Sequence, residues 1–167
     1  SYARSESDTD LYLVAAPGRI WLTRLCVTGL AALLGVRPTE ADSADRICLS
    51  FFVTADALNL KELAIERDVY LAHWIQELCP IYDEAGMTRR SYVENGWVRD
   101  LLPETRVQSP SPRRALTPVP AAWKRSIEGL LDAVFGDRLE SWSKRLQLSW
   151  MPSSLKAAAA APDSGVV

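Results

Sequence analysis

The sequence predicts an α+β fold, a small partial sheet near the amino terminus followed by a predominantly helical remainder. Two short runs, residues 11–16 and 46–54, are apolar, β-branched or aromatic and have the length of buried strands. Apolar residues later in the chain recur mainly at helical spacing, as far as residue 147. With 167 residues, 48% of them hydrophobic and 24% charged, the chain has an ordinary globular composition.

A helix is predicted between the two strands, over residues 19–36. From Leu25 this stretch is almost continuously apolar, and Gly35 is suited to stop it. The clean apolar run covers roughly a dozen residues, whereas a membrane span needs about 20, so we interpret it as a buried core helix. After a loop, the second strand is expected to lie beside the first.

The rest of the chain is predicted to be helical, apart from one linker. Apolar residues at helical spacing indicate a helix over residues 60–79, and Thr88 is suited to cap a further helix to Leu102. Half of the ten prolines fall within residues 103–120, which is typical of an exposed linker. Residues 121–147 have a wide face of Trp and Leu, expected to be core or a helix-docking surface, and Gly136-Asp137 can break this helix in two.

The formal net charge of −2 argues against a generally basic, nucleic-acid-binding surface. The three cysteines, Cys26, Cys48 and Cys79, are widely spaced and lack a Cys-x-x-Cys pair, so we expect buried free thiols in a reducing cytoplasm. The single histidine, His73, is interpreted as a helix-surface or packing residue. Carboxylates remain as the candidate groups for chemistry.

Asp8 and Asp10 stand where a polar loop runs into the first predicted strand. Residues two apart in a strand project from the same face, about 7 Å apart along the chain. Hard cations such as Mg²⁺ take oxygen ligands and are commonly held by one or two carboxylates together with substrate phosphates. The pair is therefore our candidate metal site.

The surrounding residues extend this pattern. Ser1-x-Ala3-Arg4, a short polar spacer, Ser7-Asp8-x-Asp10 and an apolar strand resemble the signature of the polymerase-beta-like nucleotidyltransferases, in which a Gly-Ser pair precedes Asp-x-Asp. Later blocks resemble a bacterial branch of the same superfamily: Pro17-Gly18-Arg19-Ile-Trp21-Leu-Thr-Arg24, Arg46-Ile-Cys-Leu-Ser-Phe-Phe, Ala72-His73-Trp-Ile, Pro80-Ile-Tyr82-Asp and Asn95-Gly-Trp97-Val. Here the residue before Ser1 would be the glycine, and the spacer is shorter than usual.

The resemblance implies transfer of a nucleoside monophosphate from a nucleoside triphosphate, ATP in the first instance, by a two-metal mechanism. Two Mg²⁺ ions would bridge Asp8, Asp10 and the α-phosphate. Ser1 would contact the β and γ phosphates, and Arg4 could reach a phosphate. The sequence does not distinguish among three kinds of acceptor: a small molecule, a protein side chain and an RNA end.

The family normally supplies a third acid from a later strand, yet residues 47–54 contain none. Asp45, Asp56 and Asp68 are the weak candidates for this ligand. The alternative hypothesis is therefore a catalytically degenerate domain that binds a nucleotide or a protein. A third is a purely helical interaction module, in which the amino-terminal acids only form a turn.

The resemblance also suggests how the chain is divided. We expect a partial nucleotidyltransferase core over residues 1–58, a helical region packed on it over 59–102, the linker over 103–120 and a truncated helical segment over 121–167. The chain opens on Ser and closes on Ser-Gly-Val-Val, so we expect an internal fragment of a longer protein. That protein is expected to be cytoplasmic, with no membrane partner.

Overall fold

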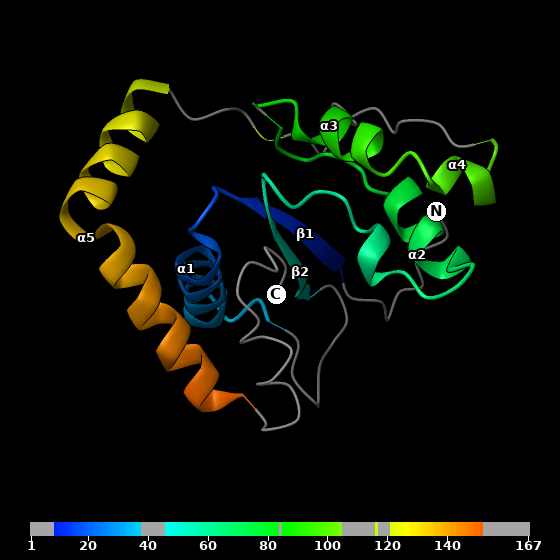
Figure 1. The fold of residues 1–167 in the computed structure, drawn as a ribbon. Coiled ribbons are helices and arrows are strands. Elements are labelled where there is room, and N and C mark those ends of the chain that lie inside the picture. Colours follow the sequence, from blue (N-terminus) through cyan, green and yellow to red (C-terminus); the bar gives the residue numbers. More distant parts are fainter. Residues whose placement is uncertain (1–8, 38–45, 84, 105–115, 117–120, 152–167) are drawn as a thin grey trace. The chain divides into compact units, whose positions relative to one another are not determined.

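A computed structural model describes residues 9–37, 46–83, 85–104, 116 and 121–151 (Figure 1). The elements, in chain order, are β1 (Thr9–Ala15), α1 (Ile20–Leu33), β2 (Ile47–Thr54), the 3-10 helix η1 (Lys61–Leu63), α2 (Val69–Gln76), α3 (Met87–Glu94), α4 (Val98–Leu101) and α5 (Ala121–Trp150). One small sheet accompanied by helices confirms the predicted α+β class.

Contacts between residues divide the chain into two compact units. The sheet unit comprises Ser1–Asp56 and Asp132–Val167, and the helical unit comprises Ala57–Leu131. Helix α5 contributes to both, because its first half belongs to the helical unit and its second half to the sheet unit. Our finer division into four segments remains a prediction.

The two described strands pair in parallel. Thr9 lies opposite Ile47 and Ala15 opposite Thr54, with a register shift just after Asp10. This shift is a bulge-type irregularity, which locally interrupts the ladder of hydrogen bonds. Both predicted strands and their pairing are confirmed, and β1 begins two residues earlier than the predicted run.

Helix α1 connects the two strands, as a parallel pair requires. Its end is set by Gly35, which adopts a φ of 64°. The Gly35 amide donates to the Ala32 carbonyl, and the Val36 amide donates to the Ala31 carbonyl, each at 3.1 Å. These two bonds satisfy carbonyls at the helix end in the Schellman arrangement. The predicted stop at Gly35 is thus confirmed.

The core of the sheet unit forms between α1 and β2, where Ile20, Trp21 and Phe52 are buried together. Partly buried residues complete this core: Leu13, Val27, Leu49, Leu148 and Met151. The far end of α1 is different, since Leu33 is 87% exposed and Leu30 and Leu34 are also exposed. The prediction of a buried core helix holds for only one face of α1.

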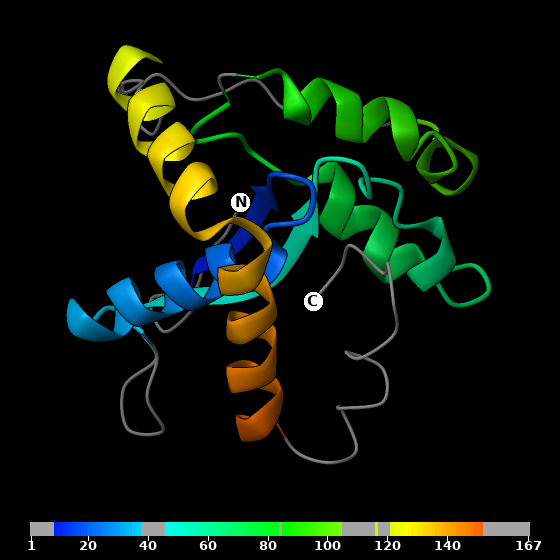
Figure 2. The ribbon, with the colours of Figure 1, turned by 60° about the vertical axis from the view of Figure 1, so that its left-hand side comes forward.

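The second half of α5 returns to the sheet unit after a kink at Gly136. Gly136 has φ 24° and ψ −128°, a conformation outside the helical region, so the predicted break is confirmed. Beyond it the helix runs past the start of α1 (Figure 2). Leu148 and Met151 then reach the core.

The predicted helix over residues 60–79 is wrong in its first half. A single 3-10 turn, η1, is followed by Arg67 with a φ of 55°, and the α-helix begins only after Asp68. The Asp68 carboxylate accepts hydrogen bonds from the Leu71 amide at 2.8 Å and the Ile65 amide at 3.3 Å. Asp68 is therefore the N-cap of α2.

The predicted cap at Thr88 is also wrong, because Thr88 lies inside α3. Gly86 occupies the N-cap position with a φ of 68°, and the Asp83 carboxylate accepts from the Met87 and Thr88 amides at 2.7 and 3.0 Å. Burial alone would raise the pKa of Asp83, but hydrogen bonds from Thr88, Met87 and Gly86 together lower it below its ordinary value. A separate short helix, α4, replaces the predicted continuation to Leu102.

The outer surface of α5 rules out one of the two roles expected for its Trp and Leu face. Trp123, Trp142 and Trp150 are exposed, whereas the buried residues of its second half are Ser143 and Gln147. The described part of the Trp face is therefore not core, and its interpretation as a helix-docking surface stays a prediction. Within the described residues, no helix is both long and apolar enough to cross a membrane.

The expectation of buried thiols is likewise wrong for two of the three cysteines. Cys26 and Cys79 are exposed, and Cys48 is half-buried. Cys26 lies on α1, whose buried residues are Ile20, Trp21 and Ala31, so it falls on the open side of a helix that buries only one face. All three thiols are free.

Candidate functional site

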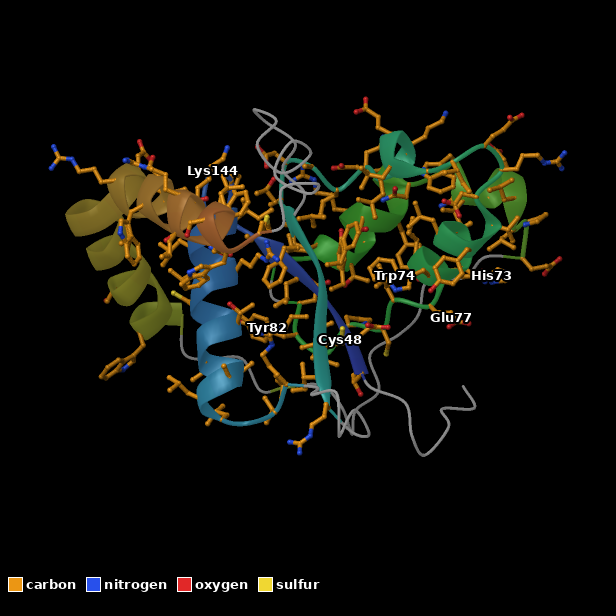
Figure 3. The ribbon with its side chains drawn as sticks, turned by 90° about the horizontal axis from the view of Figure 1, so that it is seen from below. Cys48, His73, Trp74, Glu77, Tyr82 and Lys144 are labelled. Carbon is orange, nitrogen blue, oxygen red and sulfur yellow. The ribbon has the colours of Figure 1, made fainter. Side chains whose placement is uncertain are left out.

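Asp10 is exposed at the second position of β1. Its register partner on β2 is Cys48, which Figure 3 labels on that strand. The Thr9 amide donates to the Arg46 carbonyl at 2.8 Å, so the chain just before β2 lies beside the start of β1. Asp10 thus sits at the amino end of a paired strand, where the sequence placed it. The other predicted site residues, Ser1, Arg4 and Asp8, lie outside the described residues.

Two of the three candidates for a third acid can be placed. Asp56 follows the far end of β2, and a strand rises about 20 Å between Cys48 and Thr54. Asp56 therefore does not reach Asp10. Asp68 uses one carboxylate oxygen to cap α2 and the other to accept from the Ile65 amide. Asp45 lies outside the described residues, and among those that are described no three His, Cys, Asp or Glu side chains gather as a metal site.

The opposite end of the strand pair has its own anionic group. The Trp21 and Leu22 amides at the start of α1 donate to the two carboxylate oxygens of Glu140, at 2.8 and 2.9 Å. A helix N-terminus following a strand commonly binds phosphate. Here the Glu140 side chain of α5 already fills that position.

Three further contacts hold α5 against the start of α1. Arg19 forms an ion pair with Asp137 at 3.0 Å, and the Gln147 amide donates to the Trp21 carbonyl at 2.7 Å. The Lys144 ammonium lies 5.9 Å from the centroid of the Trp21 ring, within cation–π range. Lys144 is labelled on α5 in Figure 3. These contacts are structural, since each joins one element of the sheet unit to another.

The other groups weighed from the sequence lie in the helical unit. His73 is exposed on α2, which confirms the helix-surface interpretation (Figure 3). Arg90 pairs with Glu94 on the same helix at 2.7 Å. Such an i,i+4 pair is an ordinary helix-surface interaction.

Comparison with known proteins adds no family: the chain matches no family model, no curated protein and no solved structure.

Proposed function

We propose that this chain is part of a nucleotidyltransferase, which transfers a nucleoside monophosphate from a nucleoside triphosphate to an acceptor hydroxyl or similar nucleophile. The single observation that supports this most is the position of Asp10 at the start of β1, which is paired in a sheet. A turn without a sheet beneath it would have removed the basis for the proposal. The reaction is expected in the cytoplasm, with ATP as the first donor to test.

The donor set fits the metal that the reaction needs. Carboxylate oxygens are the ligands preferred by hard cations, and Asp10 is exposed rather than buried in the core. With Asp8 as the second ligand, bound Mg²⁺ would lower the pKa of the acceptor hydroxyl and neutralise charge on the leaving pyrophosphate. The two carboxylates would hold the metal, and the metal would in turn bind the triphosphate.

The chemical step is an in-line displacement. The acceptor oxygen forms a bond to the α-phosphorus, the bond from that phosphorus to the bridging oxygen breaks, and pyrophosphate leaves with its electron pair. The acceptor proton is lost to solvent or a base. Because this step is mostly positioning and charge stabilisation, it requires few catalytic side chains beyond the metal ligands.

The test uses the intact protein with ATP labelled at the α-phosphate, Mg²⁺ and a cell extract that supplies acceptors. Label transfer should fall at least about 100-fold in Asp8→Asn and Asp10→Asn, because each removes a charged metal ligand. Asp56→Asn is the matched control and should retain transfer. Unchanged transfer in Asp10→Asn would contradict the proposal.

A second candidate is a degenerate domain that binds a nucleotide without catalysis. Its supporting observation is that β2 offers Cys48, not an acid, opposite Asp10, and that Asp56 is too distant to serve. Under this hypothesis the intact protein binds ATP in calorimetry yet transfers no label. Binding together with Asp10-dependent transfer would reject it.

A further inference from the structure

Arg24 is a cation without a counter-ion in the described structure. It is the only charged residue of α1, so no neighbour on the helix can neutralise it. Its side chain is half-buried, and its Nη1 atom is buried with no hydrogen-bond partner among the described residues. Burying a charged group is costly unless it is paired and hydrogen-bonded. A bound anion would supply the partner that this atom lacks.

The pKa of Arg24 also supports a site for an anion. Burial, and after it the nearby charge of Arg37, lowers the pKa of the Arg24 guanidinium. Both causes disfavour the cation, yet an arginine stays protonated in proteins. Two arginines close enough to repel each other are stabilised by an anion that binds between them.

The backbone places Arg37 beside the start of β2, because the Ile47 amide donates to the Val36 carbonyl at 2.8 Å. Arg46, at the same place, is held by a hydrogen bond from its guanidinium to the Gly35 carbonyl. Arg24 lies in the second turn of α1.

We propose that Arg24 and Arg37 bind phosphate oxygens of a polyphosphate chain, such as the triphosphate of a nucleotide. The identity of the ligand as a nucleotide rests on the proposed function, whereas the anion site itself does not. Guanidinium groups match phosphate geometry through paired N–H donors, and a triphosphate offers oxygens to two of them at once. Free inorganic polyphosphate shares this chemistry.

The test measures binding of MgATP and of inorganic tripolyphosphate to the intact protein by calorimetry. Arg24→Gln and Arg37→Gln should each weaken binding of both ligands by roughly ten-fold or more, because each loses a charge-assisted hydrogen bond. Arg99→Gln, which removes an exposed arginine of α4, is the matched control and should bind as the wild type does.

A stability measurement separates a binding role from a structural one. Without ligand, Arg24→Met should unfold at the same temperature as the wild type or higher, because it removes an unpaired buried cation. With tripolyphosphate, the wild type should gain thermal stability and Arg24→Met should gain much less. A large loss of stability in ligand-free Arg24→Met would overturn the proposal, since Arg24 would then have a structural partner.

The outcomes distinguish the two proposals. ATP binding that depends on Asp10 but not on the arginines would overturn the anion site and leave nucleotidyl transfer standing. Tripolyphosphate binding that depends on the arginines, with no label transfer, would support the anion site and reject the enzyme. Absence of binding by either ligand to the wild type would overturn both.

Discussion

The sheet unit and the helical unit each depend on one polar side chain, and the two differ in chemistry. In the helical unit the Asn95 amide is buried: its Nδ2 donates to the Leu58 and Ser91 carbonyls at 2.6 and 2.9 Å. Its Oδ1 accepts from the Leu60 amide and the Trp97 indole at 2.8 and 3.2 Å. In the sheet unit, Glu140 uses a carboxylate to join α5 to α1.

The comparison shows that an amide suits a buried position and a carboxylate suits a helix N-terminus. An amide is neutral and both donates and accepts, so it can be buried once all its bonds are made. A carboxylate only accepts, and its charge is best placed at a helix N-terminus, where unpaired amides and the helix dipole favour it. Asn95 is 2% exposed, whereas Glu140 stays half-buried. We therefore expect the amide to contribute more to stability.

The largest effect is expected for Asn95→Ala. It removes the Asn95 partner of the Leu60 amide and of the Leu58 carbonyl in the interior. Each group that water cannot reach costs about 1–3 kcal/mol, so we expect a loss of about 3 kcal/mol. Urea unfolding followed by circular dichroism measures it. Ser91→Ala is the control, because the buried Ser91 hydroxyl has no partner among the described residues and its removal should cost little. Equal losses of stability in Asn95→Ala and Ser91→Ala would contradict the expectation that the hydrogen bonds of Asn95 stabilise the helical unit.

Glu140→Ala should follow, with a loss of about 1–2 kcal/mol, because two amides at the start of α1 lose a charge-assisted cap. The same urea titration measures the change, and Ser141→Ala on the exposed face of α5 provides the baseline. A loss larger than that of Asn95→Ala would reverse the ranking of the two groups.

Gly136→Ala tests the kink that brings Glu140 to α1. A side chain at φ 24° strains the backbone, and the expected cost is about 1 kcal/mol. The new Cβ would meet only the Arg19 Nη2 atom, at 4.0 Å, so little of the cost is steric. Gly129→Ala, at a helical glycine with open space, should instead stabilise α5 by roughly 0.5–1 kcal/mol. The melting temperatures of the two variants should move in opposite directions.

The smallest effect is expected for Asp83→Asn, which removes the charge of a carboxylate that caps α3 in the helical unit. A lowered pKa means that the charged form is favoured in the folded protein, so Asp83 stabilises it above the ordinary Asp pKa of about 3.9. The variant should lose at most about 1 kcal/mol at neutral pH, and the difference should disappear as the pH falls below that value. A difference that persists at low pH would show that the charge of Asp83 is not the cause.

The β1–α1–β2 segment could be predicted because the residues that begin and end its elements are close neighbours in the sequence. The apolar run is stopped by Pro17-Gly18, and Gly35 supplies the left-handed residue that ends α1. The same reasoning failed over residues 60–66, where the spacing of apolar residues is helical but the Leu60 amide is taken by Asn95, 35 residues away. The spacing of apolar residues does not predict such a long-range hydrogen bond.

The candidate site shows the same limit. The strand entrance at Asp10 was predicted from its neighbours, whereas Glu140 lies 119 residues from Trp21 in the chain and no local pattern pairs them. Arg24 was passed over because one arginine in an apolar helix carries no motif. Its lack of a partner becomes visible only once α1 is packed against the sheet.

The burial of Trp21 gives the sheet unit an optical reporter of its own. The chain has six tryptophans, and Trp21 is 5% exposed, while Trp123, Trp142 and Trp150 face solvent. A soluble quencher such as acrylamide should extinguish the emission of the exposed indoles first. Light that survives quenching therefore contains the signal of Trp21 together with that of the half-buried Trp74 and Trp97. A change in its wavelength that Glu140→Ala also produces would report detachment of α5 without any label.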